Sequence, residues 1–237
     1  MCGYIRRHVD PRTLNEFLAL LGAEGDYEGA EDETAKIQHY YPAFGGDPKR
    51  TIDGLLIQKG GVLKQVDATW WYDCREVGGE LEVGQRTTFN ARNLTSFYWR
   101  DAIRHRRAIV IATGLGEGKK VAGKNKHYLV TTQRLMLLGA VYQEFPGQKY
   151  SCAIITRDTH PRFEPYHDKA FPLFLPYNVE FLKLWMSDAG DEHPQIAQLL
   201  SNPRIFADLA ITPVKTFKGE LATGLTEFLH ADERDRC

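Results

Sequence analysis

Short apolar runs separated by turn residues recur along most of the chain, and this pattern favours a fold built on β-strands. The clearest run is residues 108–112, Ala-Ile-Val-Ile-Ala, which is typical of a buried strand. Residues 54–66 carry Gly60-Gly61 between two apolar runs and predict a hairpin. Residues 128–132 and 135–141 are expected to pair with each other, and 211–214 to form a last edge strand. Further strand-like runs are 69–72 and 151–156.

Helical spacing is rarer and lies away from these runs. Residues 13–21 carry apolar side chains at helical intervals, with Thr13 as a candidate N-cap, and three further helices are expected at 95–107, 179–185 and 194–200. We therefore expect an α+β fold with a mostly antiparallel, barrel-like β-sheet and peripheral helices. With no repeat or linker in its 237 residues, the chain is interpreted as a single domain, 1–237.

Composition excludes several classes of protein. A hydrophobic content of 43% with 26% charged residues argues against wholesale disorder. No apolar stretch approaches the roughly 18 residues of a membrane span, and the first residues lack the apolar core of a signal peptide. The four cysteines, at positions 2, 74, 152 and 237, form no C-x-x-C pair. We expect neither disulfides nor a cysteine zinc site, and a cytoplasmic location.

Charge is distributed unevenly along the chain. Residues 86–126 contain ten basic and two acidic side chains, a net charge of +8, while the remainder carries −9. One basic segment on an otherwise acidic protein is typical of a site for nucleic acid or phosphate. A solvated face with scattered counter-charges is the alternative.

A glycine-rich segment, Gly-Leu-Gly-Glu-Gly, follows the buried run at residues 114–118. It does not fit the P-loop, because Lys120 stands where Ser or Thr would bind magnesium, and it does not fit G-x-G-x-x-G. What remains is Glu117, a carboxylate expected at the end of a strand. Partial burial there would raise its pKa toward a value suited to acid–base chemistry, although an ordinary turn glutamate has the same pattern.

Cys2 stands directly after the initiator Met1. An aminopeptidase removes Met1 when the next residue is small, and Cys2 would then carry an α-amine and a thiol on adjacent carbons. Both groups are partly reactive near neutral pH. The amine condenses with an aldehyde to give an imine, and the thiol can add to that imine and close a thiazolidine. A cysteine placed there by chance is the alternative.

Two further positions carry weaker signals. His167 lies in a predicted loop with no second ligand at the helical spacing a metal site would use, so a structural or solvated histidine is the simpler interpretation. Asn90 and Arg92 belong to an Asn-Ala-Arg triplet, and these residue types together can hold a phosphate or a reacting oxygen.

Taken in order, these segments resemble the SRAP family, the SOS response-associated peptidases or abasic site processing proteins. The resemblance is carried by Met-Cys-Gly at residues 1–3, Asn-Ala-Arg at 90–92, the strand and glycine-rich segment at 107–117, and His-Asp-Lys at 167–169 followed by Pro172. Lys119, Lys120 and Pro213-Val214 also fit. The match spans residues 1 to about 216, and residues 217–237 are interpreted as a C-terminal extension.

The chain departs from the family pattern around these motifs. Gly116 and Gly118 stand where the family has an aromatic residue and tryptophan beside the glutamate, and the Glu that usually follows Asn-Ala-Arg is missing. An extra residue, Phe171, precedes Pro172. These differences leave the reactive residues in place and affect the expected shape of the DNA groove.

The resemblance implies that the protein binds single-stranded DNA and captures abasic sites covalently through Cys2, without a metal or organic cofactor. It assigns catalytic roles to Cys2, Asn90, Glu117 and His167. Phosphate contacts are expected from Arg92, Arg100, Arg104, Arg106, Arg107, Lys119 and Lys120, and base stacking from Trp70 or Trp71. A monomer associated with the nucleoid follows from this interpretation. The alternatives are a thiol (auto)peptidase that uses Cys2, and a non-catalytic nucleic-acid-binding module.

Overall fold

The computed structural model describes residues 3–24 and 36–232. Four α-helices and one short 3₁₀ helix accompany the strands in this part of the chain. The elements follow in the order β1 (Ile5–Arg7), α1 (Pro11–Leu21), β2 (Ala23–Glu24), β3 (Gln38–Tyr40), β4 (Thr51–Lys59), β5 (Val62–Thr69), β6 (Cys74–Val77), β7 (Glu80–Val83), β8 (Asn90–Ala91), α2 (Phe97–His105), β9 (Arg107–Val121), β10 (Lys124–Phe145), β11 (Lys149–Arg157), η1 (Pro161–Phe163), β12 (Phe171–Pro172), α3 (Val179–Met186), α4 (Pro194–Ser201), β13 (Leu209–Val214) and β14 (Glu227–Leu229).

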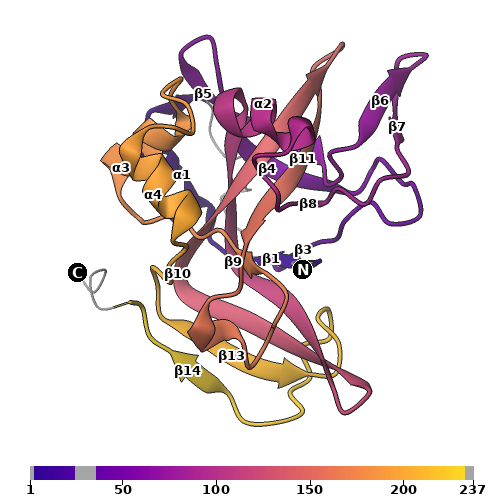
Figure 1. Cartoon of the computed structure of the whole chain (residues 1–237), viewed down its shortest axis with the longest axis vertical. Coiled ribbons are helices and arrows are strands. Elements are labelled where there is room, and N and C mark those ends of the chain that lie inside the picture. Colours follow the sequence, from indigo (N-terminus) through magenta and orange to yellow (C-terminus); the bar gives the residue numbers. More distant parts are fainter. Residues whose placement is uncertain (1–2, 25–35, 233–237) are drawn as a thin grey trace.

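A closed barrel of five strands forms the centre of the molecule (Figure 1). β10 pairs with β11, β11 with β5, β5 with β4, β4 with β9, and β9 returns to β10. The β11–β5 pairing is parallel and the other four are antiparallel. Closure leaves these strands without free edges, and it confirms the expected α+β fold with a barrel-like sheet.

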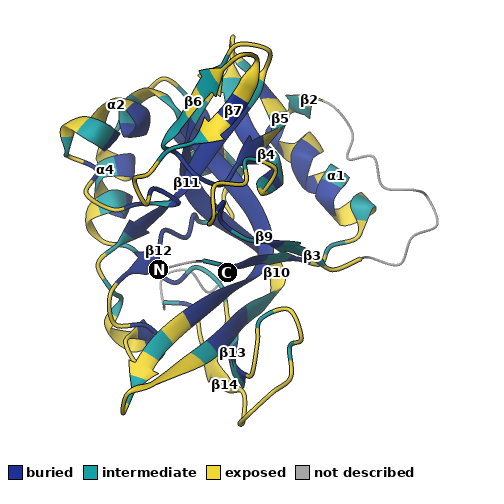
Figure 2. Ribbon diagram, turned by 90° about the vertical axis from the view of Figure 1, so that its right-hand side faces the viewer, coloured by how far each residue is buried: buried dark blue, intermediate teal, exposed yellow. Residues whose placement is uncertain are grey.

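Two hydrophobic cores lie on the two faces of this sheet. Along β9, Ala108 and Val110 point into the barrel, while Ile109 and Ile111 point outward to the helices. The outer core includes Leu14 and Phe17 of α1 together with buried side chains of α2, α3 and α4. Figure 2 shows this as dark blue along the central strands. The run 108–112 is apolar throughout because both of its faces are covered.

Helix α1 begins two residues earlier than predicted. Asp10 is its N-cap, and the Asp10 carboxylate accepts the backbone N–H of Thr13 at 2.9 Å. Pro11 occupies the first turn, where its missing N–H costs no hydrogen bond. The helix ends at Gly22, whose φ of 75° is the left-handed conformation that glycine adopts most easily.

Several predicted boundaries differ from the structure. Residues 128–132 and 135–141 are parts of one long strand, β10, which pairs with β9 and is interrupted by a register shift between Thr131 and Met136. Residues 74–83 form the hairpin β6–β7, and residues 70–72 lie outside any strand. β13 is followed by β14, so 211–214 is not the edge of the sheet. Turn composition alone does not show these long-range pairings.

Further strands extend the sheet beyond the barrel on both β9 and β10. β1 pairs with β9 and is flanked by β3, while β13 and β14 continue the sheet beyond β10. The β9–β10 ribbon extends past the barrel and carries these outer strands (Figure 1). Residues 3–7 therefore lie beside the stretch of β9 that contains Glu117, and β13 lies beside the stretch of β10 that pairs with it.

Candidate active site

The glycine-rich segment belongs to β9 rather than to a turn. Gly114, Gly116 and Gly118 alternate along the strand and present one face that carries no side chains. A Cβ on Gly116 would lie 2.7 Å from the ring of Phe217, and one on Gly114 would lie 2.8 Å from the Val130 carbonyl oxygen. These two glycines therefore allow close packing, and the expected strand end at Glu117 is corrected to mid-strand.

Glu117 is buried on the opposite face of β9. Its neighbours on that face are Leu115 and the cross-strand partner Tyr128, both part of the inner core. Only 1% of the Glu117 residue surface is exposed. Burial penalises the charged carboxylate and raises its pKa from 4.5 to about 7. Glu117 therefore exchanges protons near neutral pH.

His167 reaches Glu117 from the loop that follows β11. Its Nδ1 lies 2.7 Å from the Gly118 carbonyl oxygen and 3.3 Å from Oε2 of Glu117. A carbonyl can only accept, so Nδ1 carries the hydrogen, and the neutral ring has its lone pair on Nε2. Burial lowers the pKa of His167 to about 4, so the ring is neutral at pH 7.

Aromatic packing holds the His167 loop against the barrel. Tyr166 packs edge-on against Tyr128, with ring centroids 5.4 Å apart, and Phe163 packs against Tyr166 at 5.9 Å. Thr159 donates its hydroxyl to the His167 carbonyl at 2.8 Å. The loop is thereby closed on itself and seated beside Glu117.

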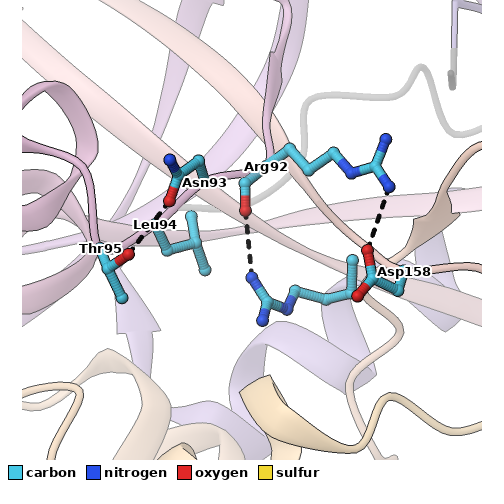
Figure 3. Close-up of a pocket in the computed structure, with 6 residues that line it drawn as sticks. Arg92, Asn93, Leu94, Thr95 and Asp158 are labelled. Atoms are coloured by element: carbon cyan, nitrogen blue, oxygen red, sulfur yellow. Dashed lines mark hydrogen bonds and ion pairs between the residues drawn. The ribbon is translucent and has the colours of Figure 1, made fainter.

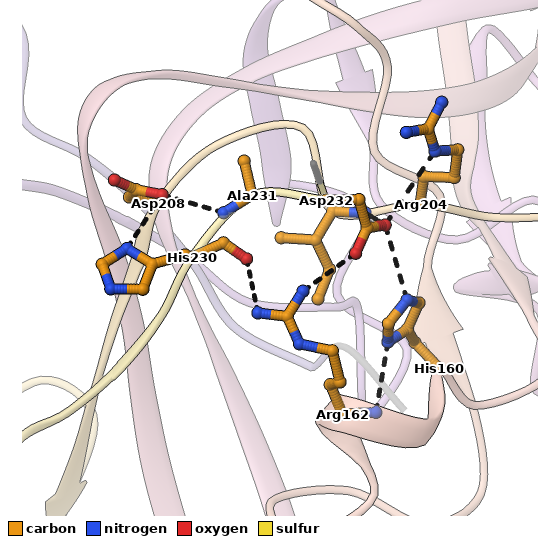
Figure 4. Close-up of polar contacts among 8 residues, drawn as sticks. His160, Arg162, Arg204, Asp208, His230, Ala231 and Asp232 are labelled. Atoms are coloured by element: carbon orange, nitrogen blue, oxygen red, sulfur yellow. Dashed lines mark hydrogen bonds and ion pairs between the residues drawn. The ribbon is translucent and has the colours of Figure 1, made fainter. Parts of the chain in front are cut away.

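The C-terminal segment is tied to the same loop (Figure 4). Arg162 in η1 donates to the carboxylate of Asp232 at 2.9 Å and to the His230 carbonyl at 2.7 Å. Nearer to His167, Tyr166 donates its hydroxyl to Glu227 of β14 at 2.7 Å. These hydrogen bonds hold the loop to the C-terminal segment, and the aromatic contacts hold it to β10.

The N-terminal strand runs toward Glu117. Ile5 pairs with Leu115, and Gly116 donates its N–H to the Tyr4 carbonyl at 2.9 Å. Because β1 and β9 are antiparallel, the chain running back from Tyr4 to Gly3 lies alongside Gly116 and Glu117. Cys2 itself lies outside the described residues.

Asn90 and Arg92 lie next to the start of the His167 loop. Asn90 in β8 pairs with Ile154 of β11, and Arg92 forms an ion pair of 3.0 Å with Asp158. Arg157 donates to the Arg92 carbonyl at 3.1 Å. Figure 3 shows the two contacts of Arg92. They border a pocket of about 320 Å³ that is lined by residues 92–95, Arg157 and Asp158.

The sequence profile of the family described as SOS response associated peptidase (SRAP) matches residues 1–219. The chain belongs to the SRAP family. Membership supports a role related to DNA damage. No curated protein matches the chain significantly.

Solved structures share the SRAP fold of this chain at low identity. A phage-related protein from Bordetella bronchiseptica is 17% identical, with a TM-score of 0.63 over 95% of this chain and 100% of that one. A second protein from the same organism is 14% identical, with a TM-score of 0.61 over 91% and 100%. A protein from Bacteroides thetaiotaomicron is 16% identical, with a TM-score of 0.58 over 90% and 92%. At these identities the likeness concerns the fold alone.

The structure does not bring the basic segment of this SRAP protein together. Arg107 and Lys119 lie twelve residues apart on β9, which at about 3.3 Å per residue separates them by about 40 Å. Arg104 pairs with Asp191 and Glu192, and Arg106 with Asp101. Arg100 is exposed on the same helix as Arg104.

Burial contradicts the predicted DNA-binding role of three residues. Arg107 is 5% exposed and donates to four backbone carbonyls, those of Ile103, Arg104, Trp185 and Ser187. Trp70 is fully buried and donates Nε1–H to the Phe89 carbonyl, and Trp71 is 6% exposed and stacks on Phe89. A ring covered in this way presents no face to a base.

The structure adds two features near the site to the residues assigned individually from the sequence. Phe44 is 48% exposed and packs edge-on against both Phe89 and Trp71, so it is the open ring of the aromatic cluster next to Asn90. Lys126 pairs with Lys119 across β9–β10, and alternation places both on the face of Glu117, whereas Lys120 points to the other face. Strand parity is the signal that could have separated Lys119 from Lys120.

Neither a helix suited to crossing a bilayer nor a metal-binding group of three or more His, Cys, Asp or Glu residues is found in residues 3–24 and 36–232.

The Glu117–His167 pair predicts two opposed effects of pH on stability. The raised pKa of Glu117 favours folding below pH 4.5, and that contribution is lost as the pH rises toward 7. The lowered pKa of His167 favours folding above pH 6.5, and that contribution is lost as the pH falls toward 4. Between pH 4.5 and 6.5 the two slopes have opposite signs and largely cancel.

Glu117→Gln should therefore expose the slope of His167. The free energy of unfolding of this variant is expected to rise with pH, by up to about 1.4 kcal/mol per unit, relative to the wild type across that window. Urea unfolding at several pH values measures the difference. Parallel curves for the two proteins would show that Glu117 does not titrate in this range.

Proposed function

We propose that the protein captures abasic sites in single-stranded DNA by forming a covalent thiazolidine through Cys2. The observation that carries the proposal is the buried pair of Glu117 and His167, toward which the N-terminal strand runs. Membership of the SRAP family and the Met-Cys-Gly start support the same conclusion. No other residue type offers an amine and a thiol on adjacent carbons.

The reaction is a condensation without change of oxidation state. The α-amine of Cys2 adds to the aldehyde carbon of the ring-opened sugar and gives a carbinolamine. Loss of one water gives the imine, and the thiol sulfur then adds to the imine carbon while its proton passes to nitrogen. The net result is one thiazolidine ring and one water.

Glu117 is suited to move the protons in these steps. With a pKa of about 7, both of its forms are present at neutral pH. The acid form can protonate the hydroxyl that leaves as water, and the carboxylate can accept the thiol proton during ring closure. Positioned groups of this kind contribute roughly 10²–10⁴ in rate.

His167 is assigned the role of hydrogen-bond acceptor at the sugar. Its Nδ1–H is engaged with the Gly118 carbonyl, and its pKa of about 4 keeps it neutral at pH 7. A neutral ring accepts the hydrogen of a sugar hydroxyl through Nε2 as the sugar opens. Protonation of the departing oxygen falls to Glu117, which holds a proton at a higher pH than His167.

The surroundings of the pair fit a single strand of DNA. Lys119 and Lys126 border Glu117 on the same face of the ribbon, and Arg92 is exposed beside the His167 loop. Phe44 replaces the buried tryptophans as the ring that stacks on a base, an interaction worth roughly 1–3 kcal/mol. The Asn90 amide is assigned to orient the sugar or the chain's amino end.

A single-stranded oligonucleotide with one abasic site tests the proposal. Incubation with purified protein should give a band of higher mass on a denaturing gel. The undamaged oligonucleotide, and the abasic one blocked beforehand with methoxyamine, are the controls that should give no such band. Absence of the shifted band from all three samples would overturn the proposed function.

The description of the family as peptidases favours a second candidate function, removal of Met1 by the Cys2 thiol. Intact mass of freshly purified protein shows whether Met1 is present. If Met1 is removed even when Glu117 and His167 are both replaced, the buried pair is not needed for that cleavage.

Arg92 should contribute one phosphate contact. Its ion pair is with Asp158, whose side chain is 94% exposed, so this pair is weak and leaves the guanidinium able to bind phosphate. Binding of undamaged single strands weakens with salt by a log–log slope of roughly −0.7 per contact. Arg92→Ala is expected to lower affinity and flatten the slope by about that amount.

Arg106→Ala is the matched control, because Arg106 is held by Asp101 and by the Tyr142 carbonyl. A salt titration of both variants measures the slopes. Flattening in Arg106→Ala alone would place the DNA along α2 rather than at Arg92, and an unchanged slope in both variants would place it elsewhere.

A further inference from the structure

A turn near the C-terminus packs on the N-terminal strand from the side opposite to Glu117. Residues 215–222, here called the clamp turn, follow β13 directly. Phe217 stacks on Tyr4 with ring centroids 5.1 Å apart and planes inclined by 14°. Glu220 forms an ion pair of 2.7 Å with Arg6, and both side chains are mostly buried. Both outward-facing side chains of this strand segment therefore contact the same turn.

Phe217 also contacts the strand that carries Glu117. Its ring occupies the space that a Cβ on Gly116 would need, and it lies 5.0 Å from the ring of His127 on β10. Gly116 donates its N–H to the Tyr4 carbonyl. One aromatic ring thus bridges the N-terminal strand and the residue immediately before Glu117.

The clamp turn is itself well held. The backbone N–H of Lys215 bonds to the Leu221 carbonyl at 2.9 Å, and that of Glu220 bonds to the Thr216 carbonyl at 3.2 Å. Glu220 has a φ of 48°, a left-handed conformation that is uncommon for a residue other than glycine. The residue with this backbone conformation is the one whose carboxylate pairs with Arg6.

The N-terminal strand needs such support, because β1 is short. Within the described residues, Ile5 and Arg6 pair with β9, and Ile5 to Arg7 pair with β3 on the other side. A slip of one residue reverses the direction of every side chain, so the contacts of the buried side chains, more than the few hydrogen bonds of a short strand, fix its register. The stack on Tyr4 and the ion pair on Arg6 oppose such a slip.

We propose that Phe217 is a positioning residue for the proposed crosslinking reaction, holding β1 in register so that the amino end of the chain meets Glu117. The inference rests on the proposed function. Reactive groups must be aligned closely, and a misplacement of about 1 Å can cost about 10²-fold in rate. The ring touches no reacting atom and acts through Tyr4 and Gly116.

Three variants and one control test this role. Phe217→Ala removes the stack on Tyr4, Phe217→Tyr keeps the ring, and Glu220→Gln removes the carboxylate charge that pairs with Arg6. Phe228→Ala removes a ring of the same C-terminal segment that is 71% exposed. For each protein, single-turnover crosslinking is measured at saturating abasic single-stranded DNA, together with affinity for the undamaged strand and hydrogen exchange of residues 3–7.

Phe217→Ala is expected to slow crosslinking by at least about tenfold, with affinity for undamaged DNA within about twofold of wild type. Glu220→Gln should slow it less, and Phe217→Tyr and Phe228→Ala should stay within about twofold of wild type. Exchange of the β1 amides should rise in Phe217→Ala while that of the β4–β5 hairpin stays unchanged.

A wild-type crosslinking rate in Phe217→Ala would overturn the positioning role. An equal rise of exchange in β1 and in the β4–β5 hairpin would also overturn it, because the ring would then stabilise the whole domain. Failure of the wild-type protein to crosslink would instead overturn the proposed function. In that case an unchanged exchange of the β1 amides in Phe217→Ala would separately contradict the clamp.

Discussion

Cys2→Ala is expected to abolish the stable crosslink to abasic single-stranded DNA. Alanine keeps the α-amine, so an imine can still form, but no thiol is present to close the thiazolidine. The imine hydrolyses on the denaturing gel, and the shifted band should disappear. Borohydride added during incubation reduces the imine to a stable amine and should restore the band.

Cys74→Ala is the matched control for this variant. Burial raises the pKa of the Cys74 thiol to about 12, and its Sγ contacts the Trp71 carbonyl, so it does not act as a nucleophile. Its replacement should leave crosslinking unchanged. A stable crosslink formed by Cys2→Ala without reductant would rule out the thiazolidine.

Glu117→Gln is expected to slow crosslink formation and reversal by roughly 10²–10⁴. The amide keeps the shape of the side chain in its buried position but cannot exchange a proton. Affinity for undamaged single strands should remain within about twofold of wild type, because Glu117 is 1% exposed and contributes no surface charge. Single-turnover crosslinking at saturating DNA separates the two quantities.

The pH dependence of the rate gives a second signature of Glu117. The wild-type profile should change slope near pH 7, where this carboxyl titrates, and the change should be absent from Glu117→Gln. Glu164→Gln, an exposed position in the His167 loop, serves as the control. A wild-type rate with a weakened affinity in Glu117→Gln would place the residue in binding rather than in proton transfer.

The burial of Glu117 changes how the glycine-rich segment is understood. Glycines after an apolar strand are typical of turns that approach a ligand. Here they form a bare face on which Phe217 packs at Gly116, while Glu117 points the other way, beside the core residues Leu115 and Tyr128. The same sequence is compatible with a turn beside a ligand and with a strand packed against an aromatic ring, because a glycine does not show which group approaches it closely.

Much of the fold could be predicted from local pattern. The Gly60-Gly61 hairpin is confirmed, and α1 ends at Leu21 as expected from its apolar spacing. The barrel-like α+β fold and the SRAP family are confirmed as well. Alternation, helical spacing, turn residues and ordered motifs are local properties, and a single sequence carries them directly.

Tertiary contacts determine which of the predicted residues lie together in the candidate site. A cysteine at position 2, a carboxylate at 117 and a histidine at 167 can all be identified from the sequence alone. The folded structure brings the carboxylate and the histidine to 3.3 Å, because the loop after β11 packs against β9, fifty positions away in the sequence. It also decided that Arg107 and Trp70 are buried and that the basic segment is divided along β9. The sequence gives the charge and the aromatic character of each side chain. The exposure of a side chain and its distance from other side chains depend on which faces of the strands the barrel encloses.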